Sequence, residues 1–381
     1  MKILIVRLFP DELNINNYNV QEIGLAKALV RKGHVCDIVL YTNKKENYVQ
    51  EVEVENDKKV KIYWLRGKKF LGNAFFDKEL NNIINNYDII QSGGYDQIYN
   101  AVFNRKLNKP LVIYHGNYYS KYSKGYKKKC FVSDIFYIFY RDYKKAHFIT
   151  KSKISTDFLN KKGYKNIETL GVGLDIDRFS ENVVINKEIE ELKNNKGENN
   201  YLLYIGKIEE RRNSLFLLEL LKLILKDETN YKLILVGKGN KEYVDKCNNY
   251  INENKLQNNI IWIESLKQDE IPELYKISDM FLLPTLHEIF GMVLLEAMYF
   301  GLPVLTTYNG GSSVLIDNGK NGFIEDVNIN NWKNIIVANV KNKEVATNAK
   351  TTIENEYTWD QLSEKFIESY KKVIEDYNSK L

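Results

Sequence analysis

Short apolar runs alternate with helix-type patterns along the whole chain, and this alternation constrains the fold more than any other feature. Such βαβ order is typical of parallel sheets that are covered by helices on both faces. In the first half we expect strands at Lys2–Phe9, Asp37–Thr42, Lys61–Arg66, Asp88–Gly93, Pro110–Gly116, His147–Ser152 and Ile167–Gly173. The helices expected between them are Val20–Lys32, Gln97–Leu107 and Lys127–Lys145.

The pattern restarts after the polar stretch Ser180–Asn200, which ends in LKNNKGENN and predicts a domain junction. Strands are then expected at Tyr201–Lys207, Lys232–Gly239, Asn259–Ser265, Met280–Thr285 and Pro303–Tyr308. The helices expected there are Ser214–Lys226, Lys241–Lys255, Asp269–Ser278 and Met292–Phe300. The sequence therefore predicts an α/β chain with two doubly wound, Rossmann-like domains facing a cleft. We assign residues 1–180 to the first domain, 181–200 to a linker, 201–357 to the second domain and 358–381 to a closing amphipathic helix.

Composition excludes several classes of protein. The 55 Lys and Arg residues exceed the 50 Asp and Glu residues by only 5, too few for a dedicated nucleic-acid binder, and no nucleic-acid partner is expected. The cysteines Cys36, Cys130 and Cys247 are scattered and fit neither a disulfide framework nor a CxxC metal site, which favours a reducing cytosol. The apolar run at the N-terminus is too short for a signal peptide, and no run reaches the ~20 apolar residues that span a bilayer.

The stretch from Pro284 to Met298 reads as a strand end, a loop and a helix start. Gly291 would open the helix and leave the first-turn N–H groups free to bind a phosphate. Glu296 lies one turn further along, where a carboxylate can accept hydrogen bonds from both hydroxyls of a ribose. Glu288, in the loop before the helix, could accept hydrogen bonds from the hydroxyls of a second polyol group. From spacing alone, the alternative that both are solvated surface acids stays open.

These residues carry a family resemblance. Glu288-Ile-Phe-Gly-Met-Val-Leu-Leu-Glu296 resembles the E-x-F-G-x-x-x-x-E signature of the retaining, GT-B-fold glycosyltransferases of family 4, the glycosyl transferases group 1. The segments Gly301–Gly311 and Asp317–Phe323 are similar to two further turns of that family, and Trp359-Asp360 begins the helix that in the family crosses back to the first domain. The resemblance implies the GT-B fold.

The resemblance also implies roles for residues of the second domain. Glu296 would hold the nucleotide ribose and Glu288 would touch the hydroxyls of the donor sugar. Lys207 and Arg212 stand where the family has G-R-x-x-x-x-K and would neutralise the diphosphate, although only Arg binds in a bidentate way. The backbone donors to sugar and phosphate would be Phe290, Gly291, Met292 and Val293, and the turn that grips the base would be Ser265-Leu266.

In the first domain, His115 ends an apolar strand and matches the family's active-site histidine; a structural histidine is the alternative. Asn16-Asn17 replaces the Gly-Gly that the family often has after its first strand. Asn tolerates a positive φ, but its side chain would narrow the approach of a phosphate or acceptor. Asp175-Ile-Asp177 formally reads DxD, which we interpret as structural. We expect no metal and no cofactor.

The segment Tyr118–Tyr143 interleaves tyrosine, phenylalanine and lysine. Such a segment suits the surface of an anionic membrane or a stacking platform for sugars. The alternative is a core-facing helix with a solvated basic rim.

Together with these patterns, the resemblance implies a retaining hexosyltransferase that moves a sugar from a nucleotide diphosphate sugar to a glycan, lipid-linked or protein acceptor. A UDP-sugar is favoured on family frequency alone, and the pathway expected is the assembly of cell-surface polysaccharide, glycolipid or glycoconjugate. Catalysis would be electrostatic, with front-face attack as the resemblance implies. The expected location is the cytoplasm, with the inner face of the membrane left open. A sugar-nucleotide epimerase of the same fold and a non-catalytic sugar-nucleotide-binding subunit are the alternatives.

Overall fold

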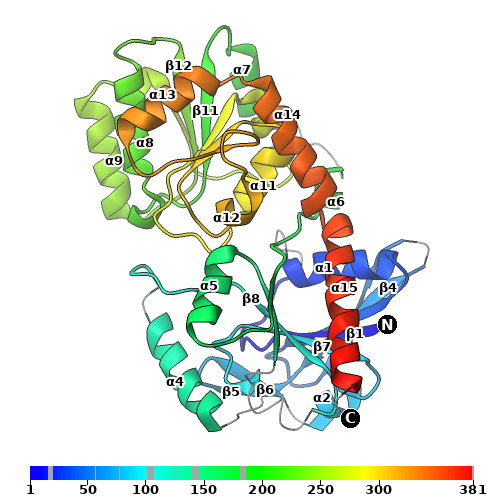
Figure 1. The fold of residues 1–381 in the computed structure, drawn as a ribbon. Helices are drawn as coiled ribbons and strands as arrows, with labels where there is room; N and C mark the ends of the chain where they lie inside the picture. The colour runs from blue at the N-terminus through cyan, green and yellow to red at the C-terminus, as the bar shows by residue number, and fades with distance from the viewer. Residues whose placement is uncertain are drawn as a thin grey trace. The chain divides into compact units, whose positions relative to one another are not determined.

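The computed structural model describes residues 1–15, 20–55, 57–76, 78–100, 107–123, 125–139, 146–180 and 186–379 of the chain. The chain divides into two compact units (Figure 1). Unit 1 comprises Met1–Asp175 together with Thr358–Leu381, and unit 2 comprises Ile176–Tyr357. Unit 1 is therefore built from two segments that are distant in the sequence.

An eight-stranded sheet forms the centre of unit 1, in the order β10-β9-β8-β7-β1-β2-β4-β3. All neighbouring strands are parallel except β3 and β4. The strands are β1 Lys2–Val6, β2 Val35–Tyr41, β3 Tyr48–Glu53, β4 Lys59–Leu65, β7 Ile89–Gly93, β8 Leu111–His115, β9 His147–Thr150 and β10 Ile167–Thr169. A separate antiparallel hairpin joins β5 Gly67–Phe70 to β6 Asn73–Phe76.

Helices cover both faces of this sheet, because its central strands are apolar on both sides. Leu4 and Val6 of β1 belong to a core cluster shared with α2, α4 and α5, whereas Ile3 and Ile5 are buried on the opposite face. The helices of unit 1 are α1 Gln21–Arg31, α2 Lys78–Ile84, α4 Tyr126–Phe139, α5 Lys153–Lys161 and α15 Trp359–Asn378.

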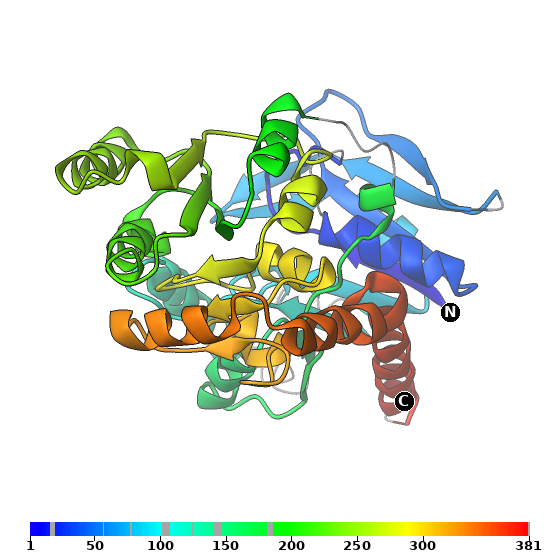
Figure 2. The same ribbon diagram turned by 90° about the horizontal axis from the view of Figure 1, so that it is seen from above.

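Helix α15 packs beside α1, as the two views in Figures 1 and 2 show. Trp359 fits between Gly24 of α1 and Gly173, where an added Cβ would lie 2.3 Å and 2.4 Å from the indole. The backbone of Leu174 pairs with Thr358, and the N–H of Trp359 donates to the Leu174 carbonyl at 3.0 Å. The chain thus re-enters unit 1 next to the point where it leaves.

Unit 2 contains a six-stranded, fully parallel sheet in the order β13-β12-β11-β14-β15-β16. Its strands are β11 Asn200–Ile205, β12 Tyr231–Val236, β13 Ile260–Ile263, β14 Met280–Leu283, β15 Val304–Thr306 and β16 Phe323–Ile324. Its α-helices are α6 Asp177–Ser180, α7 Lys187–Asn194, α8 Ser214–Ile224, α9 Lys241–Glu253, α10 Ile271–Ile277, α11 Met292–Tyr299, α12 Ser312–Leu315, α13 Ile329–Asn339 and α14 Lys343–Thr352. Unit 2 also contains two short 3-10 turns, η2 Glu210–Arg212 and η3 Gln257–Asn259, and a π-helical turn, η4 Ile353–Tyr357.

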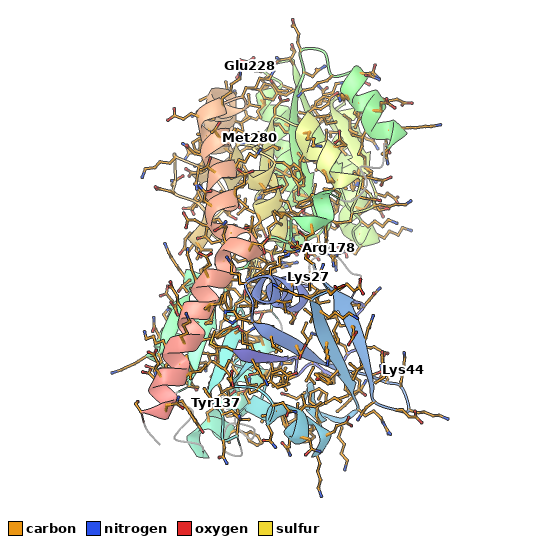
Figure 3. All side chains as sticks on the ribbon, turned by 90° about the vertical axis from the view of Figure 1, so that its right-hand side faces the viewer. Lys27, Lys44, Tyr137, Arg178, Glu228 and Met280 are labelled. Carbon is orange, nitrogen blue, oxygen red and sulfur yellow. The ribbon has the colours of Figure 1, made fainter. Side chains whose placement is uncertain are left out.

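In Figure 3, Met280 lies inside unit 2, while Lys44 extends from the surface of unit 1.

The predicted fold class is confirmed: the chain forms two Rossmann-like α/β units. Sequence patterns did not indicate β3 or the β5–β6 hairpin, whose strands carry polar residues and glycine. The segment read as a linker over 181–200 contains helix α7, which Asn186 caps and Ile189 anchors in the core of unit 2. The first unit ends at Asp175 rather than at residue 180. Most of the expected helix Gln97–Leu107, and the end of Lys127–Lys145, lie outside the described residues.

Candidate functional site

Two loops at the carboxyl ends of β11 and β14 are tied together by backbone and side-chain hydrogen bonds. The N–H of Leu286 donates to the carbonyl of Arg211 at 2.9 Å. The Arg211 guanidinium in turn donates to the carbonyl of His287 at 2.7 Å and pairs with Glu209 at 2.7 Å. Arg211, which sequence reasoning passed over, therefore positions the loop that carries Glu288.

Arg212 and Glu288 meet at this junction. The two side chains form a direct ion pair, and both are largely shielded from solvent. The second oxygen of the Glu288 carboxylate accepts the N–H of Ile289 at 3.1 Å. The structure therefore brings together one of the two predicted diphosphate-binding cations and the predicted sugar-binding carboxylate.

Gly291 begins the helix that follows this loop. Its φ of 82° lies in the left-handed region that favours glycine, and it takes the N-cap position of α11. The first-turn N–H groups of Met292 and Val293 have no intrahelical partner in such a helix. Phe290, immediately before Gly291, is buried and serves the core of the unit.

The loop after β15 packs directly on the loop of Glu288. The N–H of Gly310 donates to the Glu288 carbonyl at 3.0 Å. A Cβ at Gly310 would lie 1.8 Å from the Ile289 carbonyl oxygen, and one at Gly311 would lie 1.9 Å from that of Phe290. Only glycines allow this approach, so the Gly-Gly pair holds the backbone of the candidate site.

Glu296 lies inside unit 2, with 1% of its surface exposed. The hydroxyl of Tyr275 donates to its carboxyl at 3.0 Å. Burial raises the pKa of Glu296 to about 8. Without a bound nucleotide, the Glu296 carboxyl is therefore mostly protonated at pH 7. The sequence pattern had suggested a carboxylate that is open to a ribose.

Lys207 follows β11 and is exposed. Its loop is held by the Tyr204 hydroxyl, which donates to the Lys207 carbonyl at 2.8 Å. The loop after β12 lies against it, since a Cβ at Gly237 would lie 1.9 Å from the Gly206 carbonyl oxygen. Ser265 and Leu266 follow β13, the next strand outward, with Ser265 exposed and Leu266 half-buried.

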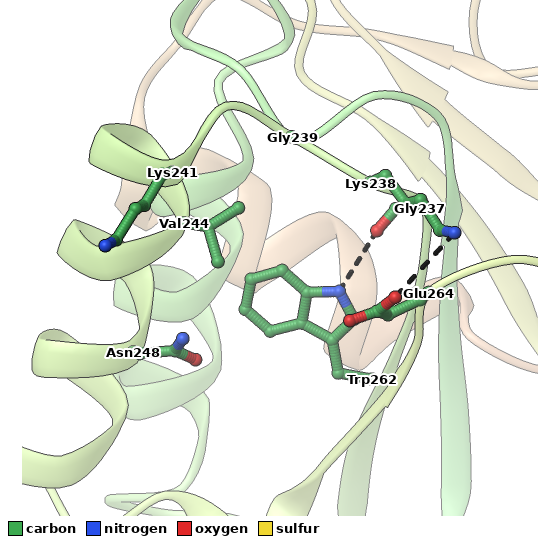
Figure 4. Close-up of a pocket in the computed structure, with 8 residues that line it drawn as sticks. All are labelled: Gly237, Lys238, Gly239, Lys241, Val244, Asn248, Trp262 and Glu264. Carbon is green, nitrogen blue, oxygen red and sulfur yellow. Dashed lines mark hydrogen bonds and ion pairs between the residues drawn. The ribbon is translucent and has the colours of Figure 1, made fainter.

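A pocket of about 450 Å³ opens at the carboxyl ends of β12 and β13 (Figure 4). The indole of Trp262 forms one side, and its N–H donates to the Gly237 carbonyl at 3.1 Å. The opposite side comes from α9, through Lys241, Val244 and Asn248. At the edge of the pocket, the ammonium nitrogen of Lys238 lies 3.8 Å from a carboxylate oxygen of Glu264. Trp262 was not singled out from the sequence, because a tryptophan in a strand reads as core.

In unit 1, His115 is the last residue of β8 and is fully buried. Burial lowers its pKa to about 3, with lesser effects from the backbone of Asn117 and from Lys151. Its Nδ1 accepts the N–H of Tyr95 at 3.1 Å, which leaves the proton of the neutral ring on Nε2. The backbone of Asn117 lies near the ring and favours its protonation, but no hydrogen bond of good geometry links Nε2 to another described residue. A buried donor of this kind is costly in a purely structural histidine.

Sequence reasoning missed two polar residues of the loops beside His115, Asp96 and Asn117. Asp96 is buried, and burial raises its pKa against the opposing effects of its own backbone, Lys129 and the side chain of Asn117. Its Oδ1 makes no hydrogen bond with the described residues. Asp96 and Asn117 lie beyond the carboxyl ends of β7 and β8, so strand order alone could have drawn attention to them.

The remaining predicted residues and segments lie as follows. Asn16 and Asn17 lie outside the described residues. Asp175 is buried. Within Tyr118–Tyr143, α4 covers Tyr126–Phe139, and its inner face carries the buried Tyr126, Cys130 and Tyr137. Among the described residues, no group of three His, Cys, Asp or Glu side chains is placed to hold a metal ion. No helix in the described part is long and apolar enough to cross a membrane.

Comparisons with known proteins agree with this arrangement. Residues 186–359 match the family described as "Glycosyl transferases group 1". The sucrose synthase of Melioribacter roseus is 37% identical over 147 residues, which are 37% of this chain and 17% of that protein. The lipopolysaccharide 1,2-N-acetylglucosaminetransferase of Salmonella typhimurium is 30% identical over 183 residues, 45% of this chain and 48% of that protein. The chain thus spans about half of this second relative and much less of the first.

Solved structures match over nearly the whole chain. Anabaena Alr3699/HepE in complex with UDP has a TM-score of 0.71 at 17% identity and covers 98% of this chain and 100% of its own. The sucrose-phosphate synthase of Thermosynechococcus elongatus has a TM-score of 0.73 at 14% identity and covers 99% of this chain and 100% of its own. The chain therefore has the GT-B fold, and its residues 186–359 are similar to the glycosyl transferases group 1 family.

Proposed function

We propose that the chain is a retaining glycosyltransferase that takes a sugar from a nucleotide diphosphate sugar held by unit 2 and transfers it to an acceptor held by unit 1. A UDP-sugar is the first choice of donor, since Alr3699/HepE was solved with UDP and with UDP-glucose. The observation that carries the proposal is the meeting of Arg212 and Glu288 beside the N-terminus of α11. Arg212 gives a cation, Glu288 an acceptor for the hydrogen bonds of sugar hydroxyls, and the N-terminus of α11 a set of N–H donors, all within one loop system.

The diphosphate is assigned to Lys207, Arg212 and the first-turn N–H groups of α11. A bound diphosphate would compete with Glu288 for Arg212, and this exchange would free the carboxylate for the hydroxyls of the sugar. Charge that develops on the leaving diphosphate would then be met by fixed positive groups, which is the main source of catalysis that this site offers.

The nucleoside is assigned to the neighbouring pocket. The loop after β11, which carries Lys207, touches the loop after β12 at Gly206 and Gly237, so the pocket adjoins the assigned diphosphate site. The base of the nucleotide would therefore lie beside Trp262 and the turn at Ser265-Leu266. Nucleotide quenching of tryptophan fluorescence tests this assignment. We expect Trp262→Phe to remove most of the quenching while the fold is kept; quenching of wild-type size would place the base elsewhere.

The ribose is assigned to Glu296. Its hydroxyls would donate to the ionised carboxylate, so binding should lower the pKa of a group that is neutral at pH 7 in the free protein. Donor affinity should therefore rise as the pH increases towards 8, with a proton released on binding.

In the transfer itself, the bond from the anomeric carbon to the diphosphate oxygen breaks, and a bond from that carbon to an acceptor hydroxyl oxygen forms on the same face. The hydroxyl proton passes to the departing phosphate oxygen. His115 would donate its Nε2 proton in a hydrogen bond to the sugar and would not act as a base, because its pKa lies near 3.

Release of nucleoside diphosphate from a panel of UDP-, GDP- and ADP-sugars, with and without glycan and glycolipid acceptors, tests the function. Acceptor-dependent release that Arg212→Ala and Glu288→Gln both abolish would support transfer. The matched control is Lys246→Ala, a surface lysine of the same unit that pairs with Glu242. Turnover of the sugar without an acceptor would favour the epimerase, and binding without turnover the non-catalytic subunit.

A further inference from the structure

Two neighbouring elements of unit 1 expose large apolar side chains. On α4, Phe131 is 65% exposed and Ile135 is 42% exposed, one turn apart and opposite the helix face that is buried in the core. At the tip of the β5–β6 hairpin, Phe70 is 57% exposed and Leu71 is 52% exposed. Large apolar side chains that are exposed in pairs on neighbouring elements differ from the singly scattered ones that are normal on a soluble surface.

The hairpin tip lies against the N-terminal part of α4, and both elements stand close together in Figure 1. A Cβ at Gly72 would lie 3.6 Å from the ammonium nitrogen of Lys129. The inner sides of the two elements share one core cluster, which contains Ala74 and Phe76 of the hairpin and Tyr126 and Cys130 of α4. The four exposed side chains therefore belong to one supported surface, which we call the α4–hairpin face.

Leu71 has an unusual backbone for its type. Its φ of 46° lies in the left-handed region, where a leucine is strained and Gly or Asn would cost less. The neighbouring Gly72, with a φ of 75°, shows the usual solution for such a turn. The exposed side chain of Leu71 makes no core contact that would offset this strain.

The charge around these residues is mostly positive, and the acidic neighbour of Ile135, Asp134, is paired with Lys162. Residues 67–76 and 118–133 together contain seven lysines and no acidic residue. Of these lysines, Lys68, Lys127, Lys128 and Lys129 are exposed and flank the apolar side chains. An apolar strip bordered by lysines matches the interface of an anionic bilayer, where the chains enter the acyl boundary and the ammonium groups stay with the headgroups. A protein-binding surface would instead be expected to lose charge towards its centre and to be poor in lysine.

We propose that the α4–hairpin face docks unit 1 on an anionic lipid surface, with Phe131, Ile135, Phe70 and Leu71 entering the bilayer interface. The sequence directed attention to lysines and tyrosines, but Tyr126 is buried in the core, and two of the four exposed apolar residues, Phe70 and Leu71, come from a hairpin that was not predicted. Lys129 also lies near enough to Asp96, which follows Tyr95 in the chain, for its charge to oppose the raised pKa of that carboxyl. The inference rests on the proposed function in one respect only: it makes a lipid-borne acceptor the substrate class.

Cosedimentation of the full chain with vesicles tests the docking surface. Vesicles of phosphatidylcholine mixed with phosphatidylglycerol should bind the chain at low salt, and binding should be lost at high salt or with phosphatidylcholine alone. Lys127→Gln with Lys128→Gln should weaken binding about 30-fold, which corresponds to two lysines at about 1 kcal/mol each. Phe131→Ser with Ile135→Ser, and Phe70→Ser with Leu71→Asn, should each reduce binding; Asn suits the left-handed position.

Two control variants belong to the same unit. Val49→Ser removes an apolar side chain that is 54% exposed on the edge strand β3, and Lys371→Gln with Lys372→Gln removes two adjacent exposed lysines of α15. Both controls should bind vesicles like the wild type. Equal binding by all variants, or no binding to anionic vesicles, would overturn the proposal. Calorimetry with UDP on the same variants separates this result from the proposed function, since loss of docking should leave nucleotide affinity unchanged.

Discussion

Glu296 is the residue whose environment differs most from what its motif suggests. The motif places a carboxylate one turn into α11, and the structure buries it beside Tyr275, where its pKa is raised to about 8. The same side chain can still serve the nucleotide, provided that binding supplies the hydrogen bonds that stabilise its charge. Spacing along the helix could predict the position of Glu296 but not its burial, since α10 and the neighbouring aromatic residues come from other parts of the chain.

The raised pKa of Glu296 has a definite effect on stability. Because the folded-state pKa exceeds the ordinary value of 4.5, the protonated form stabilises the fold, fully below about pH 4.5, and this contribution is lost as the pH rises through about 8. The melting temperature of the wild type should therefore fall between pH 5 and pH 9 more than that of Glu296→Gln. Thermal unfolding at several pH values measures this. The control Glu264→Gln changes an exposed carboxylate and should keep the wild-type slope. Parallel slopes for wild type and Glu296→Gln would contradict the assignment.

His115 leads to a prediction about the donor sugar. If its Nε2 proton binds a sugar hydroxyl, His115→Ala should lose one neutral hydrogen bond, about 0.5–1.5 kcal/mol, for a UDP-sugar and lose nothing for UDP. Calorimetry with both ligands makes the comparison, and the UDP arm also shows that unit 2 is intact. Equal losses for the two ligands, or none, would make His115 a structural residue.

At the scale of elements, the sequence predicts the parts that depend on local pattern. The apolar run of β11 and the helix start at Gly291 were found from the order of residue types, and the Gly310-Gly311 turn was found from the family resemblance. The contacts that build the site were not. Arg211 and Arg212 are adjacent and look alike in the sequence, yet one holds the backbone of His287 and the other pairs with Glu288. The 3-10 turn η2 decides which arginine reaches the His287 carbonyl and which reaches Glu288. No local sequence pattern specifies the geometry of that turn.

The Gly310-Gly311 turn carries a prediction of its own. Gly310→Ala would press a methyl group against the Ile289 carbonyl oxygen, 1.8 Å from the ideal Cβ position, so the loop of Glu288 must shift. We expect a loss of about 1–3 kcal/mol in the free energy of unfolding, with a clear loss of UDP affinity. Chemical denaturation and calorimetry measure the two effects. Gly93→Ala is the control, because an added Cβ there meets no atom within 4 Å. Wild-type stability and affinity in Gly310→Ala would show that the two loops need not touch.

At the scale of the whole molecule, unit 1 is completed by a helix from the far end of the chain. Six apolar residues of α15 are buried in unit 1, namely Trp359, Leu362, Phe366, Ile367, Tyr370 and Val373. The Tyr370 hydroxyl also donates to Gln91 of β7 at 2.6 Å. At about 1.5–3 kcal/mol for each large apolar side chain, α15 contributes as much as the whole net stability of a typical domain.

Residues 1–175 alone should therefore fail to fold cooperatively. Joining 358–381 to residue 175 through a short Gly-Ser linker should restore folding, because Leu174 and Thr358 are backbone neighbours. Circular dichroism and thermal unfolding of the two fragments make the comparison. A cooperative melt of residues 1–175 without α15 would show that unit 1 is complete before the chain returns.

The central claim is that unit 2 binds a nucleoside diphosphate through Arg212. Its most direct test is calorimetric titration of the wild type and of Arg212→Ala with UDP, GDP and ADP. The account predicts that one of the three nucleotides binds the wild type at one site, and that Arg212→Ala loses about 1.5–3 kcal/mol of that binding, the range for hydrogen bonds to a charged group. Absence of binding for all three nucleotides, or equal affinity in wild type and Arg212→Ala, would contradict it.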